Sequence, residues 1–212
     1  MRWTGLSPDA RKAERRALLL DAAFDLLGTE GWHGTTVRAV CQRSALNPRY
    51  FYESFTDLDE LVVAVYDRVV EELAREVLGA QGSVPDDPRA HLRAAIESSV
   101  RFVDDDRRRG KVLYVEALGN EALNRRRKEA GHTLVGLVEQ TATDTHGGLP
   151  AGERIARIGA AILVGGMSEL LVEWLEGRID VTREQLVDDA TELLLALGAA
   201  SAAITSRRAR SR

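Results

Sequence analysis

The sequence predicts an all-α protein with a small N-terminal unit and a larger C-terminal one. Apolar residues recur every three or four positions along most of the 212 residues, which is the period of an amphipathic helix. Cap residues and prolines stand at the starts of these stretches, and runs of β-branched residues are few. A hydrophobic content of 44% and a charged content of 29% are ordinary for a globular chain.

The first predicted helix joins a basic start to an apolar stripe. The segment 11–16 holds four of the chain's Lys and Arg residues, and Gly28 to Gly31 ends the helix. A basic run is usually a solvated face, so phosphate contact by one or two of these side chains stays an alternative. The stripe expected to face the core consists of Leu19, Ala22, Ala23, Leu26 and Leu27.

Two short helices with a tight turn between them are expected next. The first spans about 36–43, and the turn is 44–46. A left-handed conformation at Ala45 in this turn would cost on the order of 1–2 kcal/mol, because its Cβ crowds a carbonyl oxygen. The apolar face of the first helix consists of Val37, Val40 and Cys41.

The second short helix starts at an Asn-Pro pair. Asn47 is a strong N-cap, and Pro48 fits the first helical position, where its missing N–H costs nothing. Phe51 and Phe55 are spaced i, i+4 and should anchor the helix, which is too short to be stable alone. The side chains left pointing outward are Arg49, Tyr50, Tyr52 and Glu53. Arg and Tyr side chains donate hydrogen bonds to phosphates and base edges. The two short helices are therefore predicted to form a helix-turn-helix, with the second helix in the recognition role.

This stretch resembles the DNA-binding domain of the TetR family of transcriptional regulators over about residues 10 to 62. The resemblance rests on Thr35-Thr36-Val37-Arg38, the three-residue turn, the Tyr52 and Phe55 pair, and Asp-Leu-Asp-Glu-Leu at 57–61. Ala45 stands where the family usually has Gly, and Asn47-Pro48-Arg49-Tyr50 replaces a smaller run with Lys, so the operator sequence does not carry over. The candidate DNA-binding residues are Thr36, Arg38, Asn47, Arg49, Tyr50 and Tyr52.

Charge is distributed in a way that suits this expectation. The formal net charge is −4, yet the first 57 residues hold eight Lys/Arg against seven Asp/Glu, and the last six hold four Arg. The acid therefore lies mainly in the middle and C-terminal parts of the chain. Local charge rather than net charge governs the approach to phosphate.

The rest of the chain predicts further helices. A long helix should begin at Thr56, which forms a capping-box pattern with Asp59, and end near Leu78. The charged segment 104–110 is expected to be a solvated turn, with a metal site at its three aspartates as the alternative. The other predicted helices span about 88–104, 112–118, 120–141, 152–177 and 182–199.

The family resemblance divides the chain into functional parts. Residues 1–56 would bind DNA, and 57–200 would form a helical ligand-sensing and dimerisation domain. The residues of 201–212 themselves predict a disordered basic tail, whose contact with DNA stays open. A family-type pocket for a small apolar effector would be lined by Val65, Val69, Phe102, Tyr114, Leu118 and Trp174. Ordinary core packing is the alternative for each of them.

The last two long helices predict a homodimer interface. The segment 152–177 is apolar nearly all round and carries Gly165-Gly166 in its middle, where each Gly costs about 1 kcal/mol against Ala. Close packing by a second copy would account for both features. The alternative is that both helices fill the core of their own chain. The residues expected at this interface are Ile158, Ile162, Leu186, Ala190, Leu193 and Leu197.

Other classes of function find little support in the residues. The single Cys41 has no paired His, the four His residues lack metal-ligand spacing, and no Gly-rich phosphate loop follows a strand. We therefore expect no enzyme activity, no metal and no cofactor. No export signal and no apolar run near 18 residues are evident, the longest being 159–167, so we expect a cytoplasmic protein without a membrane span.

The expected function is a dimeric repressor that a small ligand releases from a palindromic duplex operator. A transcriptional activator of the same family is one alternative, because the sequence does not separate the two modes. A helical protein-interaction module without DNA binding is the other.

Overall fold

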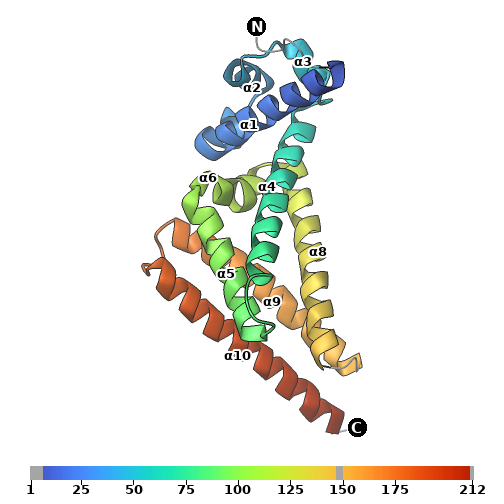
Figure 1. Ribbon diagram of the computed structural model, residues 1–212, viewed down its shortest axis with the longest axis vertical. Helices are drawn as coiled ribbons and strands as arrows, with labels where there is room; N and C mark the ends of the chain where they lie inside the picture. Colours follow the sequence, from blue (N-terminus) through green and yellow to red (C-terminus); the bar gives the residue numbers. More distant parts are fainter. Residues whose placement is uncertain (1–6, 147–149, 211–212) are drawn as a thin grey trace. The chain divides into compact units, whose positions relative to one another are not determined.

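The computed structural model describes residues 7–146 and 150–210, and every element within these ranges is helical (Figure 1). The all-α prediction is confirmed. In chain order the elements are α1 (Pro8–Gly34), α2 (Val37–Ser44), α3 (Pro48–Tyr52), α4 (Leu58–Gln81), α5 (Pro88–Asp105), α6 (Arg107–Gly110), the π-helix η1 (Lys111–Val115), α7 (Glu116–Gly119), α8 (Glu121–His146), α9 (Pro150–Leu175) and α10 (Arg183–Arg210).

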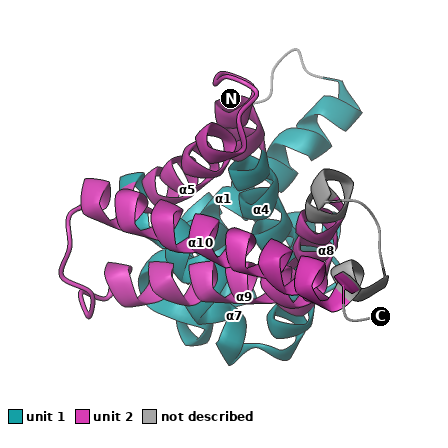
Figure 2. Ribbon diagram, turned by 90° about the horizontal axis from the view of Figure 1, so that it is seen from below, with its two compact units in different colours: residues 1–74, 105–126 teal, residues 75–104, 127–212 magenta. Residues whose placement is uncertain are grey.

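The described residues form two compact units (Figure 2). Unit 1 contains residues 7–74 and 105–126, and unit 2 contains residues 75–104 and 127–210. Unit 1 thus includes α6, η1 and α7, which the sequence placed in the larger domain. The functional boundary expected after residue 56 stays a prediction, because compactness does not say which residues bind DNA.

Unit 1 is built around the apolar stripe of α1. The helix packs against α2, α3, α6, η1 and α7. Its predicted inward residues Leu19, Ala22, Ala23, Leu26 and Leu27 are all buried. They share the core with Val40 and Cys41 of α2, Phe51 of α3, Phe55, Leu61, Val62 and Val65 at the start of α4, and Val112 and Leu113 of η1.

The start of α4 is capped one residue later than the sequence pattern indicated. The side chain of Asp57 accepts from the Glu60 N–H at 2.8 Å, and the Glu60 carboxylate accepts from the Thr56 N–H at 2.6 Å. The Asp57 side chain therefore caps α4, while the Glu60 carboxylate binds Thr56, the residue before the cap. The expected capping box of Thr56 with Asp59 is wrong. Asp59 instead accepts from the side-chain amide of Asn120 at 3.0 Å. The hydrogen bonds from Thr56 hold the pKa of Glu60 below its ordinary value.

The charged segment after α5 is ordered by an internal ion pair. Asp106 caps α6 by accepting from the Arg108 N–H at 3.1 Å, and the Arg108 guanidinium donates to the same carboxylate at 2.8 Å. The pairing of opposite charges agrees with the sequence interpretation, but the expected turn is wrong, because Asp106 alone separates the end of α5 from the start of α6. No group of three His, Cys, Asp or Glu residues that would hold a metal ion occurs in the described ranges.

Unit 2 contains α5, α9, α10 and most of α8. Helices α9 and α10 pack against each other, and the buried residues of α10 include Leu186, Val187 and Ala190. Three ion pairs join α5 to α10: Arg89 with Glu192, Arg93 with Asp188 at 2.6 Å, and Arg183 with Asp104 at 3.8 Å. These pairs are solvent-accessible, so each adds only about 0–1 kcal/mol.

The C-terminal basic segment is helical, which corrects the expectation of a disordered tail. Helix α10 continues through Arg210, and residues 211–212 lie outside the described range. Alanines favour the helix, and the Ser201 and Thr205 hydroxyls donate to carbonyls four residues earlier at 2.9 and 3.0 Å. Basic side chains at a helix C-terminus also interact favourably with its dipole. The basic composition of the segment indicated disorder and did not reveal these local interactions.

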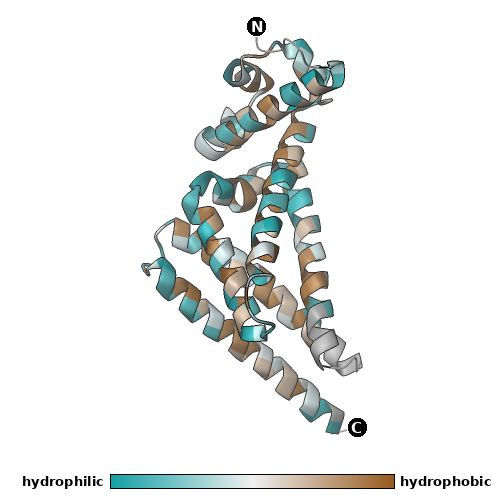
Figure 3. Ribbon diagram, in the orientation of Figure 1, coloured by the Kyte–Doolittle hydropathy of each residue, from teal (hydrophilic) through white to brown (hydrophobic). Residues whose placement is uncertain are grey.

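Helix α9 corrects the expectation about apolar length. Residues 154–175 are long and apolar enough to cross a membrane, with a mean hydropathy of 1.7 and 22% of the window buried (Figure 3). Gly and Ala residues between the short apolar runs of this helix keep its mean hydropathy high. One such helix is weak evidence for a membrane span, because core helices of soluble proteins meet the same criterion.

Candidate nucleic-acid interface

Helix α2 is capped and anchored as the sequence predicted. The Thr36 hydroxyl accepts from the Ala39 N–H at 3.1 Å, which fixes the first turn. Val40 and Cys41 face the core, where burial raises the pKa of the Cys41 thiol. A neutral, buried thiol is an apolar packing group, and this position suits the role expected for Cys41. Arg38 lies on the exposed side of the same helix.

The turn after α2 holds Ala45 in the left-handed region, with φ 55° and ψ 36°. The N–H groups of Ala45 and Leu46 donate to the carbonyls of Gln42 and Cys41 at 3.3 and 3.0 Å, so the end of α2 is satisfied. The sequence-based suspicion of a strained Ala45 is confirmed. This residue accepts a cost of on the order of 1–2 kcal/mol to set the angle between the two helices.

Helix α3 begins and is anchored as predicted. The Asn47 side-chain oxygen accepts from the Arg49 N–H at 2.9 Å, and Pro48 occupies the first helical position. Phe51 and Phe55 are buried, with ring centroids 6.0 Å apart. A helix of five residues is thereby held in place by two aromatic anchors and one cap.

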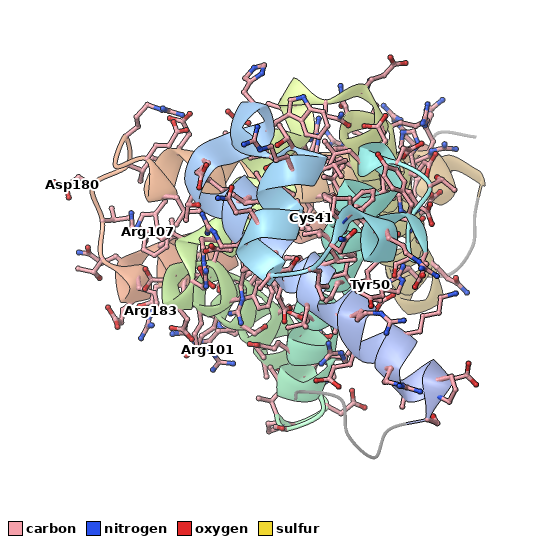
Figure 4. The ribbon with its side chains drawn as sticks, turned by 90° about the horizontal axis from the view of Figure 1, so that it is seen from above. Cys41, Tyr50, Arg101, Arg107, Asp180 and Arg183 are labelled. Carbon is pink, nitrogen blue, oxygen red and sulfur yellow. The ribbon has the colours of Figure 1, made fainter. Side chains whose placement is uncertain are left out.

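The outward side of α3 is polar and open. The Arg49 side chain is 82% exposed and Tyr52 is 63% exposed. Tyr50, which is labelled in Figure 4, is half-buried. The Arg15 guanidinium from α1 lies over its ring at 4.5 Å from the centroid. Thr36 and Asn47 use one oxygen each for capping, which leaves the hydroxyl proton and the amide N–H groups as donors. Unit 1 thus presents all six predicted DNA contacts on α2, α3 and their caps.

Two residues of this surface were not assigned by sequence reasoning. The Glu53 carboxylate accepts from Arg49 at 3.0 Å and from Arg15 at 3.5 Å. Arg15 was considered only as a phosphate contact, and Glu53 was given no role. The spacing of Arg49 and Glu53 at i, i+4 was the available signal, because such a pair meets on a helix surface. The contact with Arg15 bridges 38 positions and appears only in the fold.

A second ion-pair cluster fixes α2 on α1. Arg43 pairs with Asp25 and with Glu30, the latter at 2.7 Å, and Arg108 of α6 reaches the same Asp25 at 2.9 Å. Arg108 also holds the pKa of Asp106 below its ordinary value. The cluster joins α1, α2 and α6 inside unit 1, so the position of α2 depends on the segment that follows α5.

The C-terminal part of α1 bends at Gly31 to meet α7. Gly31 has φ 74°, and a Cβ there would lie 3.1 Å from a Glu116 carboxylate oxygen. That carboxylate accepts from the Trp32 N–H at 2.7 Å. Both the positive φ and the close approach require Gly at this position.

The helix-turn-helix geometry agrees with comparison to known families. Residues 19–65 match the sequence model described as bacterial regulatory proteins, tetR family, and this segment contains all of α2, the Ala45 turn and α3. The N-terminal segment of the chain matches the TetR family. The resemblance drawn from the sequence motifs is therefore confirmed.

Individual relatives extend the similarity beyond this domain. The chain is 30% identical over 101 residues to the HTH-type transcriptional activator FasR of Mycolicibacterium smegmatis, covering 48% of this chain and 46% of FasR. It is 28% identical over 170 residues to the regulator BetI of Paraburkholderia xenovorans, covering 78% and 82%. The match thus spans less than half the length of FasR.

Solved structures show the same fold. The fatty acid degradation regulator FadR from Bacillus halodurans superposes with a TM-score of 0.70 at 14% identity, covering 91% of this chain and 97% of FadR. At this identity the likeness concerns the fold alone. The superposition shows that the two proteins share an arrangement of helices beyond the helix-turn-helix.

The residues expected around an effector are divided between the units. Val65, Val69, Tyr114 and Leu118 belong to unit 1, whereas Phe102 and Trp174 belong to unit 2. Val65, Val69 and Phe102 are fully buried, and Leu118 is exposed. The Trp174 ring N–H donates to the Val181 carbonyl at 3.0 Å. Burial raises the pKa of Tyr114 on the π-helix, and the nearby Tyr66 raises it further. Exposed Leu118 is therefore the weakest member of this set.

The residues expected at a dimer interface fall into two groups. Ile158, Ile162 and Leu193 are 50%, 53% and 70% exposed. Leu186 and Ala190 are buried within the chain, and Leu197 is half-buried. Leu186 and Ala190 are therefore covered by this chain's own residues and have no free face for a second copy. Both groups follow the same apolar helical period, so the sequence did not separate them.

Proposed function

We propose that this chain is a TetR-family, sequence-specific DNA-binding transcriptional regulator that acts as a homodimer. The observation that carries the proposal is the outward side of α3, where Arg49 and Tyr52 are exposed on a helix anchored by Phe51 and Phe55. Such a surface suits the major groove, whose base edges offer acceptors to Arg and Tyr.

The side chains divide by reach and by chemistry. Arg49 and Tyr50 on the outward side of α3 are the proposed base contacts, because Arg pairs with the two acceptors of guanine. Thr36, Asn47 and Tyr52 are the proposed phosphate contacts, since each offers a neutral donor at the edge of the motif. Arg38 suits either role.

The proposed dimer uses the exposed apolar residues of α9 and α10. A Cβ added at Gly165 or Gly166 would meet nothing within 4 Å in the single chain. Two adjacent glycines on an open helix side cost stability without any benefit inside one chain, whereas a second copy would use the space for close approach. A dimer places two α3 helices about 34–36 Å apart, which requires a palindromic operator.

Control by a small apolar ligand completes the proposal. We assign residues up to 56 to DNA recognition and residues 57–200 to ligand sensing and dimerisation. The six residues named from the sequence as effector contacts stay a prediction, because they are divided between the two units. Ligand binding would change the spacing of the two α3 helices and release the DNA, as a coupling between two sites. Repression is the favoured mode, and the relative FasR, named as an activator, keeps activation as the alternative.

The proposal excludes catalysis and places the protein in the cytoplasm, where its DNA is. A helical interaction module without DNA binding is the competing function. That module has no physical reason to expose Arg49 and Tyr52 beside an N-capped helix start. DNA binding therefore accounts for the surface of α3 better than protein binding does.

Selection of random duplex DNA by the purified protein tests the proposal. We expect a palindrome to be enriched, with half-sites one helical turn or a multiple of it apart, and a steep loss of affinity as salt rises. If no sequence is enriched and binding is weak and independent of base order, the proposal of sequence-specific regulation is overturned. The result would then favour the interaction module.

A further inference from the structure

Arg15 and Arg49 share one carboxylate, that of Glu53. Oε1 of Glu53 accepts from Arg49 Nε at 3.0 Å, and Oε2 accepts from an Arg15 terminal nitrogen at 3.5 Å. Arg15 also lies over the Tyr50 ring at 4.5 Å. Glu53 thus connects the proposed base-reading residues Arg49 and Tyr50 through a single anionic group.

An acid at this position is unfavourable for DNA binding in general. Glu53 is the C-cap residue of α3, and its side chain is 35% exposed beside the open Arg49. DNA carries one negative charge per about 1.7 Å of helix axis, so any duplex brought to α3 meets this carboxylate. A phosphate is able to satisfy Arg49, but it repels Glu53. Contact with the backbone alone therefore breaks one ion pair without replacing the partner of the acid.

One kind of base pair arrangement satisfies both side chains. Guanine presents the N7 and O6 acceptors that Arg takes, and cytosine presents the N4 amine, which donates to a carboxylate. In the major groove, Arg49 and Glu53 are adjacent on one helix side, so they reach neighbouring base edges. The ion pair in the free protein then exchanges for two base contacts.

We propose that Glu53 is a specificity-determining residue that selects operator half-sites by accepting a hydrogen bond from the N4 amine of a cytosine. The proposal rests on the function proposed above. Glu53 lowers affinity for all duplexes through repulsion, and only a half-site with a cytosine at its position recovers the loss. Arg15 is a positioning residue, which holds Tyr50 and Glu53 in place from α1.

The test compares base selection by the wild type with that by Glu53→Gln. Glu71→Gln is the matched control, because Glu71 is an exposed carboxylate of the same unit on α4. The wild type and the control should prefer cytosine at one position per half-site by about 5- to 100-fold, the range of a good base contact. Glu53→Gln should lose this preference, and adenine should become acceptable because Gln pairs with adenine.

Binding to a duplex of shuffled sequence supplies a second readout. Removal of the acid frees Arg15 and Arg49 for phosphate, so affinity should rise and the salt dependence should steepen by about one to two units, at about 0.9 per phosphate contact. Glu53→Asp retains the charge, so it should exclude shuffled DNA as the wild type does. Equal gains for Glu53→Gln and Glu53→Asp would show an effect of shape and overturn the proposal.

The outcomes separate this proposal from the proposed function. Unchanged cytosine preference and an unchanged ratio of operator to shuffled affinity in Glu53→Gln would overturn the role of Glu53 while the wild type still selects a palindrome. A wild type that selects no sequence would instead overturn DNA recognition itself. Thermal unfolding of each variant establishes that the folded proteins are being compared.

Discussion

Helices α3 and α9 both leave much of their surface open in a single chain, but their open surfaces differ in chemistry. On α3 the exposed side chains are Arg49 and Tyr52, which donate hydrogen bonds. On α9 the exposed side chains include the apolar Ile158 and Ile162, on the same helix as Gly165 and Gly166, besides charged residues such as Arg157. Polar donors on an anchored helix suit an anionic polymer, whereas exposed apolar side chains are favoured only when another surface covers them.

The two helices also differ in how they are fixed. Five residues of α3 are held by the Asn47 cap, the Phe51 anchor and ion pairs through Glu53, so its side chains are arranged before any partner arrives. Helix α9 has 26 residues and packs on α10 with one side. This difference indicates a preorganised recognition surface in unit 1 and an unfinished apolar surface in unit 2.

The largest effect is expected from a charge placed on the apolar surface of unit 2. Leu193→Glu or Ile162→Glu should convert the dimer to monomers, because the carboxylate would lose its hydration at the interface. Operator affinity should fall at least about 100-fold, since one half-site supplies only part of the contacts. Sedimentation and DNA titration measure both quantities. Leu78→Glu, at a similarly exposed leucine of α4, is the control and should leave both unchanged. Dimers that survive Leu193→Glu and Ile162→Glu would refute the proposed interface.

Next in size are paired substitutions on α3. Tyr50→Ala should lower the ratio of operator to shuffled affinity by about 5- to 100-fold, because a base contact is lost. Tyr52→Phe removes only a hydroxyl and should weaken both duplexes by a similar factor, as a phosphate contact does. Competition titrations with the two duplexes give the ratio. The same ratio for wild type and Tyr50→Ala would show that Tyr50 does not read bases.

The glycine pair on α9 sharpens the comparison further. Gly166→Ala should stabilise an isolated helix by about 1 kcal/mol, because Ala has the higher helix propensity. If a second copy packs there, the added methyl should instead weaken the dimer. Urea unfolding at several protein concentrations separates the change in helix stability from the change in dimer stability. A gain in stability that is independent of concentration, with an unchanged dimer, would mean that the glycines do not lie at the interface.

A smaller effect is expected at the turn that orients α3. Ala45→Gly should stabilise unit 1 by about 0.5–1 kcal/mol, which is the relief of the left-handed strain less the added unfolded-state entropy. The control is Ala39→Gly inside α2, where glycine should cost about 1 kcal/mol. Urea unfolding measures both. Destabilisation by Ala45→Gly equal to that of Ala39→Gly would contradict the φ of 55° at this residue.

The smallest predicted effect concerns pH and the support of α2. The Arg108 ion pair lowers the folded-state pKa of Asp106, so its contribution to stability is complete above the ordinary Asp value of about 3.9 and is lost as pH falls through the lower folded value. Asp106→Asn should therefore destabilise the protein at neutral pH and remove part of the loss seen between about pH 4 and lower values. Unfolding free energies of wild type and variant, measured from neutral pH to below pH 4, test this prediction. A parallel pH dependence in wild type and variant would contradict the role of the pair.

Sequence reasoning succeeded where the physical signal was local. The Asn47-Pro48 start, the Phe51 and Phe55 spacing and the left-handed Ala45 each depend on a few neighbouring residues, and all three are confirmed. These features shape the helix-turn-helix, which lies in the segment that matches the TetR family. The outward side of α3 followed from the same local rules.

Prediction from the sequence failed where a residue's position depends on contacts distant in sequence. Leu186 and Leu193 follow the same helical period, yet the first is buried in the chain and the second is open. Likewise, the link from Arg15 to Glu53 forms only when α1 meets α3. The helical C-terminal segment was missed because charge suggested disorder, whereas side-chain to backbone bonds at Ser201 and Thr205 support the helix.

Methylation interference on the selected duplex tests the central claim most directly. Guanine N7 lies in the major groove, and adenine N3 lies in the minor groove. If α3 reads the major groove, guanine methylation should block binding at symmetric positions about one helical turn apart, and Arg49→Ala should abolish the block at one guanine per half-site. Interference confined to adenine N3, or a pattern that Arg49→Ala leaves unchanged, would contradict recognition by α3.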